Sequence, residues 1–235
     1  MIKLAYTLSS TLLLGLLASA KPHTNIVYIL ADDLGYGDLS ILGQSHFQTP
    51  HIDELARKGM IFTDHYSGST VCAPSRASLL TGLHTGHAPV RGNFEWQPEG
   101  QYPMPENTYI IPQMLKRAGY TSGIFGKWGL GAPETSSEPL SMGFDRFYGY
   151  NCQRIAHHYY PYFLWDDDQL EVLWDNFGME MGTYAPDLIH QEVLDFIEAN
   201  QDQAFFCYYA IIQPHAEMLA QEEYMNKYRG RFLPE

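Results

Sequence analysis

Short apolar runs that alternate with segments of helical spacing constrain the fold of this chain more than any other feature. The runs at 25–31 and 205–212 carry no charged residue and are rich in β-branched or aromatic side chains. Such runs are typical of strands buried on both faces of a sheet. Further strands are predicted at 60–66 and 120–125, and helices at 49–58, 75–80, 108–118 and 186–199. The alternation predicts an α/β fold, with a mostly parallel central sheet and helices on both faces.

The composition is globular and limits the partners of the chain. Of the 235 residues, 45% are hydrophobic and 17% are charged, which indicates one domain or part of a larger one. The formal net charge of −13 excludes a broad basic face of the kind that binds nucleic acid. An anionic ligand must therefore be bound by a few local cations. We expect no nucleic-acid partner.

The N-terminus has the pattern of an export signal. Lys3 precedes an apolar run at 12–17, and small residues follow at Ala18 and Ala20. This pattern predicts a signal peptide over residues 1–20, cleaved after Ala20, and a secreted, periplasmic or other exported location. The run is shorter than the roughly 20 residues that a membrane span needs, so no stable membrane anchor is expected. Export permits disulfides, but with three cysteines at least one is left unpaired.

Four polar side chains lie at the ends of predicted strands. Asp32 and Asp33 follow the first strand, Lys127 follows a central one and His215 follows the last. In open α/β sheets the ligand crevice lies outside the carboxyl ends of the strands. Adjacent carboxylates there suit a hard cation such as Ca²⁺ or Mg²⁺. For Asp32 and Asp33 alone, a helix cap or an ion pair with Lys or Arg is an equal alternative.

Cys72 begins the most informative stretch of the chain. It directly precedes a predicted helix whose first turn holds Pro74 and Arg76. Free N–H groups at a helix start attract anions, and the guanidinium of Arg76 adds a planar cationic fork. A lone cysteine is more often a small buried apolar residue, but the residues around Cys72 argue against that interpretation. The pattern Cys72-x-Pro74-x-Arg76, followed by Leu-Thr-Gly, resembles the signature of the sulfatase family.

The resemblance to sulfatases extends over residues 21–235. The segments 25–38, 49–56 and 126–131 look like the family's opening strand with its metal-binding turn, its first helix and its lysine segment. Pro214-His215 is similar to a later sulfate-facing histidine. The resemblance implies an alkaline-phosphatase-like fold and a sulfuric ester hydrolase of arylsulfatase type.

The resemblance also implies a role for each matched residue. Cys72 is oxidised after synthesis to formylglycine, whose hydrate is the nucleophile, so the machinery that makes formylglycine is an expected partner. Asp32, Asp33 and Cys72 are the expected ligands of Ca²⁺, with Mg²⁺ as the alternative. Arg76, Lys127 and His215 are expected to bind the sulfate group and to stabilise its developing charge, with His215 as the candidate general acid.

Two departures from the family pattern stand out. Gly129 occupies a position where the family usually has a histidine, and His84, His87, His157 and His158 are candidate replacements. The remaining metal ligands of the family, an Asp-Asn pair, and a second lysine normally lie further downstream. We therefore expect residues 21–235 to be the N-terminal part of a longer catalytic domain, with a fold that is incomplete at the C-terminus. In such a fold the strand at 205–212 is expected to lose part of its surroundings and to favour aggregation.

The segment 148–162 indicates the substrate class. It is predicted to be a loop, and it combines aromatic rings and amides with Arg154 and His157, which we expect to bind substrate. Rings and amides together suit a sugar, although a packing cluster between loops has the same composition. The expected substrate is a sulfated carbohydrate, or an aryl sulfate as a generic substrate. Three alternatives stay open: a phosphate or phosphonate monoester hydrolase on the same fold, a non-catalytic remnant that binds sulfated sugars, and a purely structural exported domain.

Overall fold

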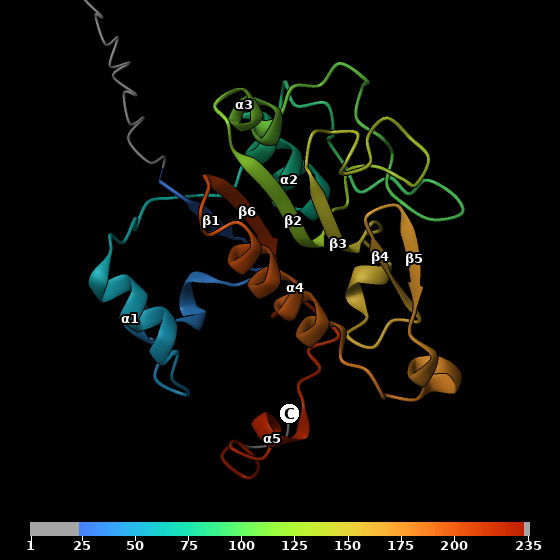
Figure 1. Ribbon diagram of the computed structural model, residues 1–235. Helices are drawn as coiled ribbons and strands as arrows, with labels where there is room; N and C mark the ends of the chain where they lie inside the picture. Colours follow the sequence, from blue (N-terminus) through green and yellow to red (C-terminus); the bar gives the residue numbers. More distant parts are fainter. Residues whose placement is uncertain (1–23, 233–235) are drawn as a thin grey trace, which may run out of the picture.

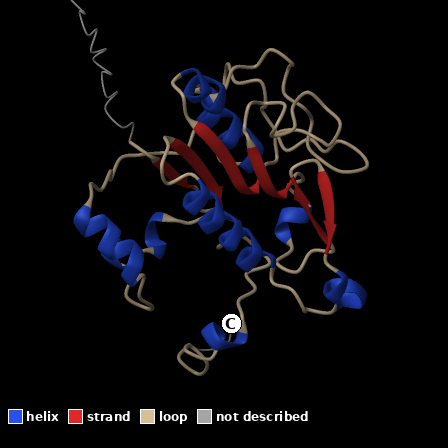
Figure 2. Ribbon diagram, viewed as in Figure 1, coloured by secondary structure: helices blue, strands red, loops and turns tan. Residues whose placement is uncertain are grey.

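The computed structural model describes residues 24–232, which fold around one six-stranded sheet (Figures 1 and 2). The strand order is β1-β6-β2-β3-β4-β5. The strands are β1 (Ile26–Ile29), β2 (Thr121–Lys127), β3 (Arg146–Tyr150), β4 (Phe163–Asp166), β5 (Gln169–Val172) and β6 (Phe205–Ala210). The first four strands in this order pair in parallel, and β4 and β5 join them as antiparallel strands. The predicted α/β class and the mostly parallel sheet are confirmed.

Helices cover both faces of the sheet, as the alternating pattern predicts. The described helices are α1 (Pro50–Lys58), α2 (Cys72–Thr81), α3 (Ile111–Arg117), α4 (Ala185–Ala199) and α5 (Glu222–Met225). Side chains that alternate along the strands supply two separate cores. Ile124 and Tyr208 pack in one core with residues of α2 and α3, whereas Phe125 and Cys207 pack in the other with residues of α4. In Figure 1, α4 crosses the front of the sheet and α2 lies behind it.

The apolar strand β6 lies inside the sheet. It pairs with β1 on one side and β2 on the other, and most of its side chains are buried. The expectation that this strand loses its surroundings is therefore wrong for the described residues. The edge strands are β1 and β5, and both are partly exposed: Val27 and Ile29 of β1 are 46% and 56% exposed, and Leu170 of β5 is 49% exposed.

Three local predictions differ from the structure. Residues 60–66 form no strand, and Met60, Phe62 and Tyr66 are more than 70% exposed. An apolar run needs a neighbouring strand to complete its hydrogen bonds, and no described strand lies beside this one. The predicted loop 148–162 begins inside β3 and contains a 3-10 turn at Ile155–His157. Helix α2 begins at Cys72, three residues before the predicted start, since proline is tolerated in a first helical turn.

The export prediction rests on residues that the structure does not describe. The predicted signal peptide, residues 1–20, lies outside the described residues. Within residues 24–232, no helix combines the length and the apolar character needed to cross a bilayer.

Candidate active site

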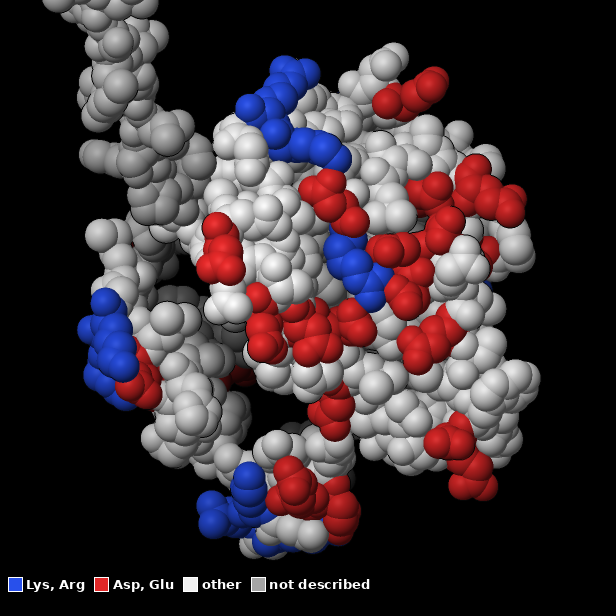
Figure 3. Space-filling view, in the orientation of Figure 1, with Lys and Arg blue, Asp and Glu red and all other residues white. Residues whose placement is uncertain are grey.

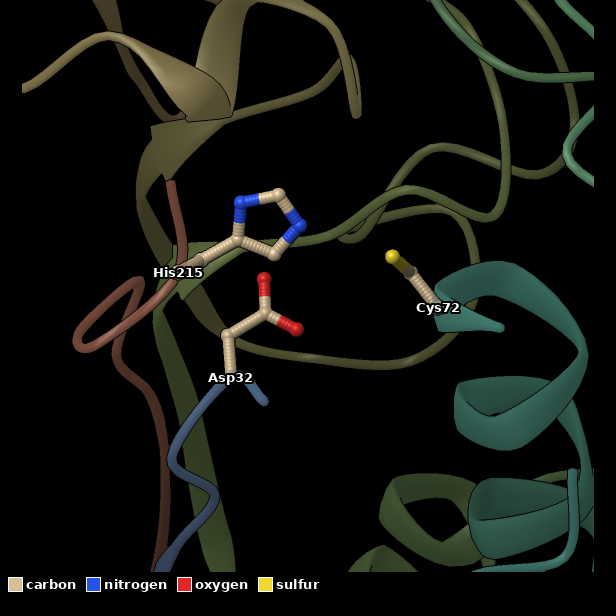
Figure 4. A group of neighbouring side chains, drawn as sticks. All are labelled: Asp32, Cys72 and His215. Atoms are coloured by element: carbon tan, nitrogen blue, oxygen red, sulfur yellow. The ribbon is translucent and has the colours of Figure 1, made fainter. Parts of the chain in front are cut away.

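The polar residues at the strand ends converge at one place. The Asp32 N–H donates to the Gln213 carbonyl at 3.1 Å, which ties the segment after β1 to the segment after β6. Figure 4 shows Cys72, at the start of α2, with its sulfur directed toward Asp32 and His215. Potential ligand atoms of these three residues all lie within 4.8 Å of one another. The structure therefore joins three chain segments at the carboxyl edge of the sheet, where ligands bind in open α/β folds.

A buried cluster of charges lies under this edge. Lys127 Nζ is 2.6 Å from Asp32 Oδ2, and Arg76 Nη2 is 3.6 Å from Asp32 Oδ1. Arg76 also donates a hydrogen bond to the Lys127 carbonyl, and both cationic side chains are almost fully buried. Two cations thus face one carboxylate, in a protein whose visible surface carries many acidic side chains (Figure 3). The cluster offers the uncompensated positive charge that an anionic group requires.

Asp32 is held in its ionised form by these cations. Burial alone would raise the pKa of its carboxyl group, but the charges of Arg76 and Lys127, with the hydrogen bond from Lys127, outweigh burial and lower the pKa. A carboxyl group whose pKa is lowered by folding stabilises the folded state above its unfolded pKa. That contribution is lost only as the pH falls through the lowered pKa. Asp32 is therefore an anion at neutral pH.

Cys72 differs from the other two cysteines in its surroundings. All three are free thiols, but Cys152 and Cys207 are buried, and burial raises the pKa of the Cys207 thiol to about 12. Cys72 is partly accessible and is the first residue of a ten-residue helix. Arg76 follows it by one helical turn, so both side chains project from the same end of α2. Among the described cysteines, Cys72 is the accessible one, and it lies beside Asp32 and His215.

Two histidines pack against each other beside Asp32. The rings of His157 and His215 stack with centroids 4.3 Å apart and an interplanar angle of 14°. His215 Nε2 lies 3.3 Å from Asp33 Oδ2, and the Tyr159 hydroxyl donates to the His215 carbonyl at 2.8 Å. His157 Nε2 is buried without a hydrogen-bond partner. Burial lowers the pKa of His157, and the nearby charges of Lys127 and His215 lower it further, so His157 is neutral at pH 7.

The described residues form a candidate metal site. Asp32, Cys72 and His215 offer one oxygen, one sulfur and one nitrogen. This mixed set suits Ca²⁺ poorly, because Ca²⁺ takes oxygen ligands. An oxygen in place of the sulfur at residue 72, together with the carboxylates of Asp32 and Asp33, makes a set of hard donors that fits Ca²⁺ or Mg²⁺. Asp33 lies beside His215 but outside the three-residue group, and its side chain is 65% exposed, so its role as a ligand stays a prediction.

Gly129 contacts the buried side chain of Gln153, which was not among the predicted site residues. Gly129 has φ +70°, and a Cβ there would lie 1.8 Å from Gln153 Nε2. That amide donates to the Gly129 carbonyl at 3.2 Å, while Gln153 Oε1 is buried without a partner. The space next to residue 129 is therefore filled from residue 153. The sequence shows an unusual glycine at position 129, but nothing in the sequence indicates that Gln153 is its partner.

Of the four histidines considered as replacements, His157 is the one that packs on the site. His158 Nδ1 instead lies 2.9 Å from Glu217 Oε1. Among the described contacts, none joins His84 or His87 to Asp32, Cys72 or His215.

Arg154 is paired with Glu95, and no described contact joins it to Asp32, Cys72 or His215. Its side chain is 52% exposed, and its Nε is 3.7 Å from Glu95 Oε1. It lines a cavity of about 600 Å³ together with His158, Glu99 and Glu217. This cavity adjoins the site, because the Glu217 N–H donates to the carbonyl of His157 at 3.4 Å. We call it the side cavity.

We expect the difference in stability between the unchanged protein and a Glu99→Gln variant to depend on pH. Glu99 lies in the side cavity. Burial raises the pKa of its carboxyl group, and the hydrogen bond from Trp165 only partly opposes the rise. A carboxyl group with a raised pKa stabilises the folded state below its unfolded pKa of about 4.3, and this contribution is lost as the pH rises through the folded pKa. We expect Glu99→Gln to stabilise the protein at pH 7 but not near pH 4. Urea unfolding at several pH values measures the change in the free energy of unfolding that Glu99→Gln causes. A change that does not vary with pH contradicts a raised pKa for Glu99.

Comparisons with known proteins bear on the fold and the family of this chain. The expected alkaline-phosphatase-like fold is confirmed. The solved structure of the phosphonate monoester hydrolase of Agrobacterium radiobacter shares this fold with a TM-score of 0.61, at 20% identity over 87% of this chain and 44% of that one. The family model named Sulfatase matches residues 24–235, and the chain belongs to the sulfatase family.

Two further similarities refine the comparison. N-acetylgalactosamine-6-sulfatase of Rattus norvegicus is 35% identical over 243 residues, which cover 93% of this chain and 45% of the rat protein. The solved structure of BT4656, in complex with its substrate D-glucosamine-2-N,6-O-disulfate, has a TM-score of 0.70 at 25% identity and covers 90% of this chain and 38% of that chain. The chain thus spans about half the length, or less, of these relatives.

Proposed function

We propose that this protein hydrolyses sulfate esters, releasing sulfate from a sulfated carbohydrate or an aryl sulfate. The observation that carries the proposal is the placement of Cys72 at the start of α2, within 4.8 Å of Asp32 and His215. The buried cations Arg76 and Lys127 stand under the same edge. This arrangement offers a position for a nucleophile next to a binding site for an anion. Membership of the sulfatase family supports the same reaction.

The nucleophile that we propose is residue 72 after oxidation of its thiol to formylglycine. As a hydrate, this residue supplies one hydroxyl oxygen that attacks sulfur and a second whose deprotonation expels sulfate and restores the aldehyde. Arg76 and Lys127 bind the sulfate oxygens and stabilise the charge that builds on them. When the S–O bond of the ester breaks, the departing alcohol oxygen takes a proton, and His215 is the candidate donor. Stacking on His157 holds the His215 ring in place.

The proposed metal is Ca²⁺, with Mg²⁺ as the alternative. Asp32, Asp33 and the oxygen of residue 72 would hold it. A divalent cation there would supply positive charge that favours ionisation of the hydroxyl group at residue 72 and offsets the charge of the sulfate. Lys127 restrains one oxygen of Asp32 at 2.6 Å and so fixes the orientation of that carboxylate.

The direct test is the chemical state of residue 72. Trypsin cleavage after Lys58 and Arg76 releases the peptide 59–76, which contains Cys72 and no other cysteine. In a host with the formylglycine-generating machinery, mass spectrometry should detect the aldehyde at residue 72, and a carbonyl reagent should label this peptide. Unmodified thiol in every such preparation would sink the formylglycine mechanism. Faster turnover of phosphate or phosphonate monoesters than of sulfate esters would favour the alternative hydrolase.

A sulfated carbohydrate is the proposed natural substrate. Two relatives carry this chemistry in their names, N-acetylgalactosamine-6-sulfatase and the sulfated glucosamine complex of BT4656. Aromatic and amide side chains near the site suit a sugar ring. The signal-like N-terminus favours export, which would bring the enzyme to extracellular polysaccharides. Binding of a sulfated sugar without any release of sulfate would instead identify a non-catalytic remnant.

Loss of Arg154 and His157 should weaken sugar binding selectively. We expect Arg154→Ala and His157→Ala each to raise KM for a sulfated sugar more than KM for a small aryl sulfate. Arg154 lines the side cavity, His157 belongs to the stacked pair, and neither side chain is the proposed nucleophile. Removal of a hydrogen bond to a charged group corresponds to roughly a tenfold change. Steady-state kinetics with both substrates measures the two effects. Equal changes for sugar and aryl substrate would remove the case for sugar-specific contacts.

A further inference from the structure

The side cavity next to the candidate active site has no part in the proposed cleavage of the ester bond. Its volume of about 600 Å³ lies within the ~300–1,000 Å³ typical of ligand pockets. His158 and Glu217 line it, and each directly adjoins the segment of one of the stacked histidines His157 and His215. The two chain segments that carry the stacked histidines therefore also form part of the cavity wall.

The walls of the side cavity fit the face of a sugar ring. Tyr160, Tyr162 and Phe163 line it, and aromatic rings pack against the C–H faces of pyranoses. Tyr162 is 48% exposed and is supported from behind by Phe177, with ring centroids 4.9 Å apart. Tyr160 is supported by Tyr184 at 5.2 Å. These rings are held in place before a ligand arrives, so little side-chain entropy is lost on binding.

The charges of the side cavity exclude anionic rings. Glu99, Glu180 and Glu217 line it, against Arg154 as the lining residue with a permanent positive charge. Arg154 is already compensated by Glu95 at 3.7 Å, and His158 is paired with Glu217 at 2.9 Å. An added carboxylate or sulfate would meet like charges without a free cation. Carboxylate oxygens readily accept hydrogen bonds from sugar hydroxyl groups.

We propose that the side cavity binds an uncharged sugar ring that neighbours the sulfate-bearing unit of the substrate. The inference rests on the proposed function, because it assumes that the sulfated end of the same molecule lies at Cys72. It assigns to this site a substrate class: carbohydrates in which the ring next to the sulfated unit carries hydroxyl or acetamido groups, and neither a carboxylate nor a second sulfate.

The test uses two small probes that differ only by oxidation at one carbon, methyl β-galactopyranoside and methyl β-galactopyranosiduronate. Titrations followed by saturation-transfer NMR should give at least about tenfold tighter binding of the neutral galactoside. Tyr162→Ala should weaken galactoside binding by about two- to tenfold, whereas the control Tyr66→Ala, an exposed tyrosine outside the cavity, should not. Glu217→Gln should reduce the difference in binding affinity between the two probes.

The outcomes separate this inference from the hydrolase proposal. Equal binding of both probes, absence of galactoside binding, or an equal effect of Tyr162→Ala and Tyr66→Ala would overturn the assignment of the side cavity. None of these readouts needs turnover. Hydrolysis of a small aryl sulfate reports on the residues around Cys72 alone, so its failure contradicts the hydrolase instead.

Discussion

Replacement of Cys72 by alanine is expected to reduce the release of sulfate by a factor on the order of 10⁶, the scale of losing a covalent nucleophile in a hydrolase. The side chain at residue 72 is the group that the proposed mechanism places in contact with sulfur. The fold should be unaffected, because Cys72 is only partly buried at the first position of α2. Turnover of an aryl sulfate and the melting temperature, measured on the same preparation, test both statements.

Cys152→Ala is the matched control for Cys72→Ala. Cys152 is also a free thiol, but it is buried, and its nearest polar contact is the Gly100 carbonyl at 3.8 Å. Its removal should lower stability modestly and leave the turnover of correctly folded enzyme intact. If the turnover rate of Cys72→Ala is more than a small fraction of the rate of Cys152→Ala, then the hydrolysis does not need the side chain of residue 72.

Replacement of Lys127 by methionine should lower the free energy of unfolding by about 3–5 kcal/mol, because it leaves Asp32 buried with a single, longer ion pair. Lys127 is fully buried, and its Nζ is 2.6 Å from Asp32, whereas Arg76 lies at 3.6 Å. Sulfate release should fall as well, since one of the two cations that face the anion is gone. Urea denaturation measures the change in stability.

Lys116→Met is a control with the same ion-pair distance in a different environment. Lys116 Nζ is also 2.6 Å from a carboxylate, that of Asp145, but the two side chains are 59% and 29% exposed. Exposed pairs contribute at most about 1 kcal/mol, so this variant should change stability little. A Lys127→Met variant no less stable than Lys116→Met would mean that Asp32 is not a constrained buried anion.

Much of the fold could be predicted from local sequence patterns. The runs at 25–31 and 205–212 are apolar, and the strands β1 and β6 that they form lie in the parallel part of the sheet, which was predicted correctly. The hairpin of β4 and β5 was missed because a run of acidic residues crosses its turn, where Asp167 takes φ +55°. The exposed run at 60–66 was misread, since apolar content alone does not supply a neighbouring strand.

The site was predictable in its residues but not in its contacts. Asp32, Lys127 and His215 were placed by one rule, that ligands lie beyond the carboxyl ends of strands. Their pairing joins residues far apart in the chain, such as Asp32 and Lys127, which are separated by 95 positions. The stack of His157 on His215 depends on how two loops meet, and no periodic pattern encodes it.

The contact between Gly129 and Gln153 links the possible changes at two distant positions. Any side chain added at residue 129 meets the Gln153 amide at its first carbon, on a backbone that already favours glycine. A substitution at 129 alone must therefore displace the Gln153 side chain and accept a strained backbone, whereas a smaller residue at 153 removes the first of these costs. The effects of changes at the two positions are thus expected to depend on each other. Engineering of new chemistry beside Lys127 should include residue 153.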